Sequence, residues 1–351
     1  MSPARRGYAE ICNVSGYKRC GCYPGPGDSK YTRGVVGLIT GSDKYPGAAV
    51  LGVTAAAKAG AGYIRYMGTE YTQQLVLQSR PEPVMGIGSG SHIDAWVIGS
   101  GMADTGSASV GEARHEAAEA VLDACAGSGG SGAGTSGYCV VDAGALPYFT
   151  QAAVRHAVPG AGSVRNAVVT PHAGEAVSML GICGYDADRT EVEGDPEKYA
   201  VLLAQKLACG VVLKGSPTVI YSPDAPYPVC LNSTHWLATA GTGDVLAGIM
   251  GTLLAQNSEA INRGGKDIQT VAAAAVFIHS LAAGLASEDG LSVEKLFTRD
   301  MQGIQNDIRQ DTQGRKSGQS AREGHPITAM DLCAQIPSAV GLVLSRKQGR
   351  G

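Results

Sequence analysis

The residues whose chemistry is easiest to interpret form one short segment, Gly241-Thr242-Gly243-Asp244. Two glycines allow a tight turn and let a ligand approach the backbone closely. The apolar residues that follow predict a helix, and the free N–H groups and positive dipole end at its start favour anions. The segment therefore predicts a phosphate-binding turn in which Asp244 can take a proton from an attacking hydroxyl. A second interpretation stays open, because aspartate at a helix start often serves only as a cap.

A second candidate is Lys214-Gly215-Ser216-Pro217-Thr218, which follows an apolar run typical of a buried strand. Lys214 at a strand end can pair with a phosphate as a point charge, and Thr218 can donate a hydrogen bond. An ordinary tight hairpin with Lys214 in solvent explains the same residues equally well.

Histidine and carboxylate side chains follow other apolar runs. In Thr170-Pro171-His172-Ala173-Gly174-Glu175, both His172 and Glu175 are expected at one edge of the fold, although a purely structural helix start would also use them. Three aspartates are candidates for metal or hydroxyl contacts: Asp43, Asp104 and Asp142. Each is equally typical of a turn, and none supplies a metal-binding pattern.

Short apolar runs alternate with alanine-rich or apolar helical segments, and these elements have to position the candidate residues. The expected strands are 35–39, 63–66, 95–98, 138–141, 167–170, 211–214 and 218–221, and the expected helices are 48–59, 109–126, 173–180, 241–254 and 271–286. Strand–helix–strand units favour parallel pairing with right-handed crossovers. Their repetition predicts a three-layer α/β/α sandwich around a mainly parallel central sheet. Ligands of such sheets bind beyond the carboxyl ends of the strands.

One domain is expected over residues 34–339. Residues 1–33 are polar and rich in turns, which indicates an N-terminal extension, and residues 340–351 are expected to form a frayed basic tail. The Gly/Ser-rich run 127–137 is interpreted as a loop, because the strand–helix alternation resumes after it. Residues 288–326 are polar and are expected to loop over the surface.

Composition excludes some classes of partner. A net charge of −3 argues against a general nucleic-acid or anionic-membrane binder. No apolar run is expected to span a membrane, and the N-terminus lacks the apolar part of a signal peptide. The nine cysteines are odd in number and lie mostly in apolar runs, which indicates a reduced, cytoplasmic protein. The cluster Cys12, Cys20 and Cys22 lacks a fourth zinc ligand in a paired spacing, so no metal ligands are assigned.

Seven segments, taken together and in order, resemble one family, the ADP/ATP-dependent NAD(P)H-hydrate dehydratases of the ribokinase-like superfamily. They are Gly41-Ser42-Asp43-Lys44-Tyr45-Pro46-Gly47-Ala48-Ala49-Val50-Leu51, Ala59-Gly60-Ala61-Gly62, Gly99-Ser100-Gly101, Val141-Asp142-Ala143-Gly144-Ala145-Leu146, Thr170-Pro171-His172-Ala173-Gly174-Glu175, Leu213-Lys214-Gly215-Ser216-Pro217-Thr218 and Ala240-Gly241-Thr242-Gly243-Asp244-Val245-Leu246-Ala247-Gly248. The resemblance covers residues 30–290. The last segment alone indicates only a ribokinase-like protein, whereas the combination is specific to the family.

The resemblance implies an enzyme that repairs NADH or NADPH hydrated on the nicotinamide ring. A donor nucleotide would phosphorylate the ring hydroxyl, and phosphate would then leave as the lone pair of the ring nitrogen restores the double bond. The family pattern favours ADP as the donor, with ATP as the alternative, and implies the S epimer as the substrate, with AMP and phosphate as the products from ADP. It also implies a stand-alone dehydratase without a fused epimerase domain, a homo-oligomer (a tetramer), and Mg²⁺ beside the phosphates.

The resemblance also assigns roles to residues. Asp244 would be the catalytic base and would touch the hydrate. Three further residues would contact the hydrated dinucleotide: Ala48, Gly101 and His172. The nucleotide would be held by Lys214, Gly215, Ser216, Pro217 and Thr218 together with Gly241, Thr242 and Gly243.

Three positions depart from the family pattern. Gly144 stands where the family often has aspartate, Pro217 where it often has glycine, and Ala240 where the glycine is often doubled. Pro217 removes a backbone N–H that could meet a phosphate. Two other functions stay open, a ribokinase-like small-alcohol kinase of the thiazole or pyrimidine type and a non-catalytic nucleotide sensor. Asp244 argues against the sensor, which needs no base at that position.

Overall fold

A nine-stranded sheet forms the centre of the computed structural model, which describes residues 17–18, 20–21, 23–86, 92–102, 113–126, 137–156, 164–298 and 324–345. The strands are β1 Val35–Ile39, β2 Tyr63–Tyr66, β3 Val84–Met85, β4 Ala95–Ile98, β5 Tyr138–Val141, β6 Ala167–Val169, β7 Gly210–Leu213, β8 Thr218–Tyr221 and β9 Val229–Leu231. Their order across the sheet is β3-β2-β1-β4-β5-β6-β7-β8-β9. The strands from β3 to β7 pair in parallel, and β8 and β9 add antiparallel pairs. The prediction of a mainly parallel sheet is confirmed, as is the 218–221 hairpin.

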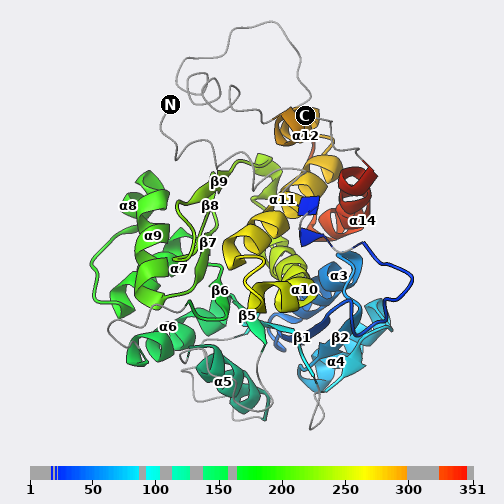
Figure 1. Cartoon of the computed structure of the whole chain (residues 1–351), viewed down its shortest axis with the longest axis horizontal. Helices are drawn as coiled ribbons and strands as arrows, with labels where there is room; N and C mark the ends of the chain where they lie inside the picture. Colours follow the sequence, from blue (N-terminus) through cyan, green and yellow to red (C-terminus); the bar gives the residue numbers. More distant parts are fainter. Residues whose placement is uncertain are drawn as a thin grey trace, which may run out of the picture.

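Helices cover both faces of the sheet (Figure 1). They are α3 Pro46–Lys58, α4 Glu70–Ser79, α5 Ala113–Ala126, α6 Leu146–Arg155, α7 Ala173–Ile182, α8 Arg189–Gly194, α9 Pro196–Leu207, α10 Thr242–Asn262, α11 Ile268–Ala286, α12 Gly290–Thr298 and α14 Ala329–Ser345, with 3-10 turns η1 Ala143–Ala145 and η2 His235–Leu237. Consecutive strand residues point to opposite faces, so Leu38 packs in the core beneath α3, α10 and α11, whereas Ile39 packs in the core beneath α5, α6 and α9. Two separate cores give the expected three-layer sandwich.

The chain beyond α11 differs from the expectation. Helix α12 lies within 288–326, which was expected to be loop, and α14 continues to Ser345, six residues into the expected tail at 340–351. The reason is a helical apolar spacing: Leu332, Ile336 and Val343 are all fully buried. The basic residues after Ser345 hid this pattern in the sequence. The start of the helix expected at 109 and most of the loop at 127–137 lie outside the described residues.

Part of the expected N-terminal extension belongs to the core. Tyr17 and Cys20 are buried in the same apolar cluster as α10 and α11. Asn257 of α10 donates a hydrogen bond from Nδ2 to the Cys20 carbonyl at 2.8 Å, and the Cys20 thiol donates to the Thr270 carbonyl. The hydrogen bonds from the Asn257 amide and from the Cys20 thiol fix this segment against α10 and α11. Cys12 and Cys22, the other members of the cysteine cluster, lie outside the described residues.

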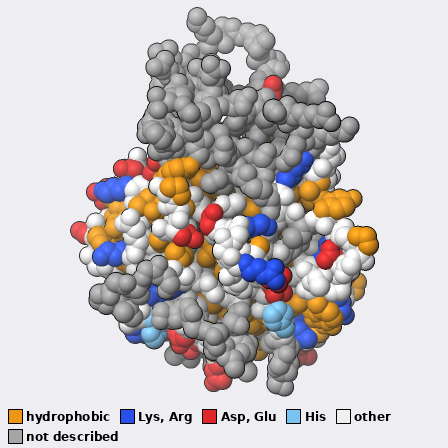
Figure 2. Space-filling model, viewed as in Figure 1, with side chains coloured by type: hydrophobic (Ala, Val, Ile, Leu, Met, Phe, Trp, Pro, Cys, Tyr) orange, Lys and Arg blue, Asp and Glu red, His pale blue; other side chains and the backbone are white. Residues whose placement is uncertain are grey.

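Helix α11 has the length and apolar composition of a membrane span, although 94% of its most apolar window is buried within the fold. A core helix enclosed by its neighbours has the same composition, and burial is the simpler explanation here. On the face shown in Figure 2, acidic and basic side chains of the described residues are interspersed rather than separated by sign.

A buried guanidinium ties three helices together at the edge of the sheet where β6 begins. Arg165 donates to the carbonyls of Ala126, Leu207, Ala153 and His156, the last two at 3.0 and 3.2 Å. These carbonyls belong to the C-terminal ends of α5, α9 and α6, where the helix dipole is negative and the last carbonyls lack intrahelical partners. One cation therefore satisfies carbonyl groups from three different helices.

Replacing this residue by an apolar side chain of similar length (Arg165→Met) leaves these carbonyls without their charged donor. We expect the free energy of unfolding, measured by urea denaturation, to fall by about 3 kcal/mol. The control is Arg155→Met on the exposed end of α6, where the expected change is within about 0.5 kcal/mol. Equal stabilities of the two variants would contradict the role given to Arg165.

Candidate active site

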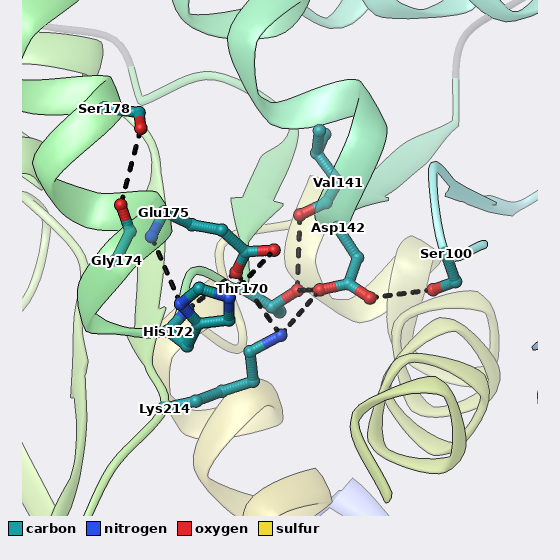
Figure 3. Close-up of polar contacts among 9 residues, drawn as sticks. All are labelled: Ser100, Val141, Asp142, Thr170, His172, Gly174, Glu175, Ser178 and Lys214. Carbon is teal, nitrogen blue, oxygen red and sulfur yellow. Dashed lines mark hydrogen bonds and ion pairs between the residues drawn. The ribbon is translucent and has the colours of Figure 1, made fainter. Parts of the chain in front are cut away.

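Four neighbouring strands bring their carboxyl ends together around one buried carboxylate (Figure 3). Asp142, directly after β5, is only 3% exposed. Its Oδ1 accepts hydrogen bonds from Thr170 Oγ1 at 2.7 Å and Lys214 Nζ at 2.8 Å, and its Oδ2 accepts one from Ser100 Oγ at 2.8 Å. Ser100, Thr170 and Lys214 follow β4, β6 and β7. The parallel order of these strands therefore places four polar side chains at one point of the sheet edge.

Asp142 and Lys214 keep each other charged. Burial alone would raise the pKa of Asp142, but the charge of Lys214 and the hydrogen bonds from Lys214, Thr170 and Ser100 lower it below its usual range. Burial likewise opposes the charge on Lys214, whose pKa is nevertheless raised by the carboxylates of Asp142, Glu175 and Asp244. At neutral pH the site thus holds a fixed ion pair, and the alternative of a solvated hairpin lysine is excluded by this contact.

His172 and Glu175 begin α7 and adjoin the ion pair. The Glu175 backbone N–H donates to His172 Nδ1 at 3.1 Å, and the His172 N–H donates to Glu175 Oε2 at 2.8 Å, so the two residues cap the helix reciprocally. The same Glu175 oxygen lies 3.8 Å from Lys214 Nζ. The His172 side chain is 60% exposed. The ring therefore has a structural cap function on one side and a face open to a ligand on the other.

The glycine turn before α10 is held in a fixed shape. Gly241 has a φ of 89°, which favours glycine, and a Cβ there would lie 2.6 Å from Leu51 Cδ1. Thr242 Oγ1 donates to the carbonyls of Leu237 and Thr239, both at 2.9 Å. The first N–H groups of α10 are consequently presented at the same sheet edge as the strand ends.

Asp244 lies in the first turn of α10 but does not act as its N-cap. The N-cap residue is Gly241, which makes no side-chain capping bond. Burial, and to a smaller extent the negative charge of Asp142, raise the pKa of Asp244, the charge of Lys214 lowers it in part, and the resulting pKa is about 7. A carboxylate that exchanges its proton near neutral pH suits a general base. These properties favour the catalytic interpretation over the capping one.

The Lys214 side chain lies against the glycine turn at the start of α10. A Cβ placed on Gly243 would be 3.5 Å from Lys214 Nζ. The ammonium group of Lys214 thus lies between the buried carboxylate of Asp142 and the backbone of the glycine turn. A phosphoryl group bound at the turn would meet both the free N–H groups of α10 and this ammonium.

The expected substrate residues Ala48 and Gly101 are adjacent. Gly101 has a φ of 67°, and a Cβ there would lie 2.5 Å from the Ala48 Cβ. The Gly101 carbonyl accepts a hydrogen bond from Ser42 Oγ at 2.7 Å, and the Gly41 N–H donates to the Ser100 carbonyl at 2.7 Å. The loops after β1 and β4 are therefore joined, and both adjoin the site of Asp142.

The remaining candidates have structural contacts. Gly215 and Ser216 are exposed in the β7–β8 hairpin, Pro217 follows a cis peptide bond, and Thr218 Oγ1 donates to the Gly215 carbonyl at 3.1 Å. Asp43 accepts a hydrogen bond from Thr69 Oγ1 at 2.6 Å near the start of α4, and Asp104 lies outside the described residues. Within the described ranges no group of three or more His, Cys, Asp or Glu residues is placed to hold a metal ion.

Sequence reasoning identified Lys214 but assigned no role to Ser100 and Thr170, the other two partners of Asp142, or to one histidine, His279. Ser100 and Thr170 carried a usable signal, since each is a hydroxyl residue directly after a buried strand. His279, which contacts the turn from α11, carried none, because a single histidine in an apolar helix is most often a satisfied core residue.

The sheet order and the helices on both faces are those of the ribokinase-like fold. The solved structure of an ADP/ATP-dependent NAD(P)H-hydrate dehydratase from Bacillus subtilis, co-crystallised with ATP and Mg²⁺, has the same fold with a TM-score of 0.63. It is 22% identical in sequence, over 92% of this chain and 94% of that one. The model of the NAD(P)H-hydrate dehydratase family matches residues 36–299, and the chain belongs to this family.

Curated relatives fall into two kinds. The ADP-dependent (S)-NAD(P)H-hydrate dehydratase of Xanthomonas campestris is 30% identical over 74% of this chain and 82% of its own length. The bifunctional NAD(P)H-hydrate repair enzyme of Corynebacterium glutamicum is 34% identical over 75% of this chain and 45% of its own length. The chain thus spans less than half of the bifunctional relatives that it matches.

The raised pKa of Asp244 has a consequence for stability. Its usual pKa is 3.8 and its value in the folded chain is about 7. As pH rises between these values, the unfolded chain loses this proton while the folded chain retains it, so the folded state loses relative stability, and the full cost is present above pH 7. Asparagine carries no such charge. We therefore expect Asp244→Asn to raise the stability by about 2 kcal/mol at pH 8.

The measurement is the melting temperature at pH 8 and pH 4. Most of the gain should disappear at pH 4, because this pH lies close to the usual pKa of 3.8, where the difference in protonation between the folded and unfolded chains has only begun to cost stability. Asp224→Asn, at an exposed position, is the control and should show neither effect. A gain of equal size at both pH values would show that Asp244 is not the titrating group.

Proposed function

We propose that this chain catalyses the ADP-dependent dehydration of the S epimer of hydrated NADH and NADPH, giving NADH or NADPH, AMP and phosphate. The observation that carries the proposal is Asp244, a carboxylate with a pKa of about 7 beside the phosphate-binding turn of α10. Membership of the family and the name of the Xanthomonas relative support the reaction and the donor. The chemistry divides into a transfer step and an elimination step.

In the transfer step Asp244 accepts the proton of the ring hydroxyl as the oxygen attacks the terminal phosphorus of ADP. A new O–P bond forms, and the bond between that phosphorus and the oxygen it shares with the α-phosphate breaks, so AMP leaves with the electron pair. The first N–H groups of α10 and the Lys214 ammonium, 2.8 Å from Asp142, face the negative charge of the phosphoryl group. Lys214 therefore acts on the transferred group as well as on the donor.

In the elimination step the C–O bond of the phosphorylated ring breaks and phosphate takes the electron pair. The lone pair of the ring nitrogen compensates for the loss, and release of a proton from the adjacent carbon restores the ring double bond. Phosphate is a far better leaving group than hydroxide, which is the reason for using a nucleotide. The net reaction removes one water and converts ADP to AMP and phosphate.

Two surfaces would hold the ligands. The nucleotide would lie along Lys214–Thr218 and Gly241–Gly243, and the hydrated ring would contact Ala48, Gly101 and His172 before reaching Asp244. The closeness of Lys214 to Gly243 and of Ala48 to Gly101 supports this division. Pro217 lacks a backbone N–H, so donors at this hairpin have to come from Gly215, Ser216 and Thr218.

Mg²⁺ is proposed to enter with the nucleotide. The donor set fits an ion held chiefly by phosphate oxygens and water, because Asp142 is already occupied by Lys214, Ser100 and Thr170. Asp244 is the carboxylate nearest the turn with capacity for a further contact. The ion would neutralise phosphate charge when bound, and the protein residues would orient the nucleotide around it.

The setting of the enzyme is proposed to be the cytoplasm. All seven cysteines described by the structure are free thiols, which supports a reducing compartment. The homo-oligomeric state, expected to be a tetramer, stays a prediction from the sequence.

The test is incubation of the protein with hydrated NADH and either ADP or ATP. We expect the absorbance of NADH to return, with AMP and phosphate released in equal amounts when ADP is the donor. Asp244→Asn should lower kcat by about 10³-fold or more while ADP still binds. A stable phosphorylated alcohol as product would indicate a small-alcohol kinase instead, and nucleotide binding without turnover would indicate a sensor.

The pH dependence of kcat/KM tests whether Asp244 is the base. Because Asp244 must be deprotonated, kcat/KM should fall tenfold per pH unit below about pH 7. Asp142→Asn removes a neighbouring negative charge, so the falling limb should move to lower pH. Asp43→Asn, away from this ion pair, should leave the limb in place. A limb that does not move in Asp142→Asn would show that another group limits the rate.

A further inference from the structure

Helix α11 is apolar along nearly its whole length, yet it carries a titratable side chain in the core, that of His279. The residue is 6% exposed, and Phe277, Ile278 and Leu281 beside it are buried in the apolar cluster. A polar ring in such surroundings costs free energy unless it is hydrogen bonded. The hydrogen bond that His279 makes therefore explains how the fold tolerates a buried imidazole ring.

That bond reaches the phosphate-binding turn. His279 Nε2 lies 2.9 Å from the carbonyl oxygen of Thr242. A carbonyl only accepts, so the hydrogen is assigned to Nε2. Burial lowers the pKa of His279, the bond to Thr242 raises it in part and the charge of Lys214 lowers it, so that the resulting pKa is about 4. The ring is thus a neutral donor with a fixed tautomer throughout the neutral range.

The direction of this carbonyl fixes the direction of a neighbouring donor. The Thr242 carbonyl and the Gly243 N–H belong to one planar trans peptide group, in which the C=O and N–H bonds point in opposite directions. His279 holds the carbonyl on the core side. The Gly243 N–H then points to the N-terminal side of α10, and Lys214 Nζ lies 3.5 Å from the Cβ position of this residue.

Such a restraint matters at the start of α10. Thr242 and Gly243 are the first two residues of the helix, whose geometry orients the Thr242 carbonyl, but helix ends fray, and the glycines on both sides of Thr242 loosen this one further. Thr242 Oγ1 fixes the side chain through the Leu237 and Thr239 carbonyls, but it does not fix the orientation of the following peptide group. The bond from His279 adds a second restraint on this peptide group, from the buried helix α11.

We propose that His279 is a positioning residue for phosphoryl transfer, which holds the Thr242–Gly243 peptide so that the Gly243 N–H faces the transferred phosphoryl group. The inference rests on the proposed function, since it presumes that a phosphate binds at this turn. Donors that are oriented before the reaction do not have to reorganise as charge develops in the transition state. A positioning role therefore affects kcat rather than the binding of the hydrated ring.

The experiment compares three variants of the full chain. His279→Leu removes the donor and keeps an apolar volume, His279→Gln keeps an N–H donor at similar reach, and Phe277→Leu perturbs the packing of the same helix without touching the turn. For each we measure kcat and KM with hydrated NADH, the dissociation constant of ADP by calorimetry, and the melting temperature.

We expect His279→Leu to lower kcat about tenfold or more, less than the 10²- to 10³-fold typical of deleting a direct donor. The KM for hydrated NADH should change less than twofold, ADP should bind more weakly, and His279→Gln should restore most of both losses. Phe277→Leu should lose melting temperature but keep kcat within twofold. Equal kcat and ADP affinity in His279→Leu and the wild type would overturn the inference, as would an equal loss in His279→Leu and Phe277→Leu.

The two proposals fail in different ways. A wild type that binds ADP without dehydrating hydrated NADH would refute the proposed function, and the ADP affinities of the variants would still decide the inference. A wild type that neither binds ADP nor turns over would refute both.

Discussion

The ion pair between Asp142 and Lys214 is the interaction on which the site depends. It draws on side chains that follow β4, β5, β6 and β7, so it forms only when these four strands lie in their observed order. Buried ion pairs contribute little net stability, because desolvation offsets the attraction. What this pair contributes is position: it places a cation against the glycine turn and a fixed negative charge near Asp244. The ion pair between Asp142 and Lys214 thus affects both the pKa of Asp244 and the position of the Lys214 ammonium.

The layered fold could be predicted because each layer has its own pattern. Val35 to Ile39 is apolar at every position, as a strand covered on both faces requires, and the alanine-rich run that became α3 cannot continue such a strand. The last helix could not be placed, since the apolar spacing of Leu332, Ile336 and Val343 ends beside basic residues that suggested a tail. Boundaries depend on what packs against a segment, and the sequence does not contain that information locally.

The sequence was sufficient to predict that the site residues lie at the ends of strands, but not which of them contact one another. Asp142, His172 and Lys214 each follow an apolar run, and parallel strands must bring such positions to one edge. Which of these side chains touch depends on the order of the strands. The same strands and helices could be arranged in many orders, and each order would bring different side chains into contact. Lys214 as an ordinary hairpin residue was equally compatible with the sequence, and only its 2.8 Å contact with Asp142 decides the matter. His279 lies 37 residues from its partner Thr242, beyond the reach of any local pattern.

The guanidinium of Arg165 bears on how a ligand meets the molecule. Helices that follow parallel strands all run back along the sheet, so their negative ends collect at one edge and their positive ends at the other. Arg165 neutralises the negative ends of α5, α6 and α9 inside the protein, where no outside cation is needed. At the other edge, Glu175 and Asp244 lie in the first turns of α7 and α10, and the Lys214 ammonium lies 3.8 Å from Glu175. The negative helix ends are thus compensated inside the fold, whereas a phosphate at the opposite edge would meet the first N–H groups of α10 and the Lys214 ammonium.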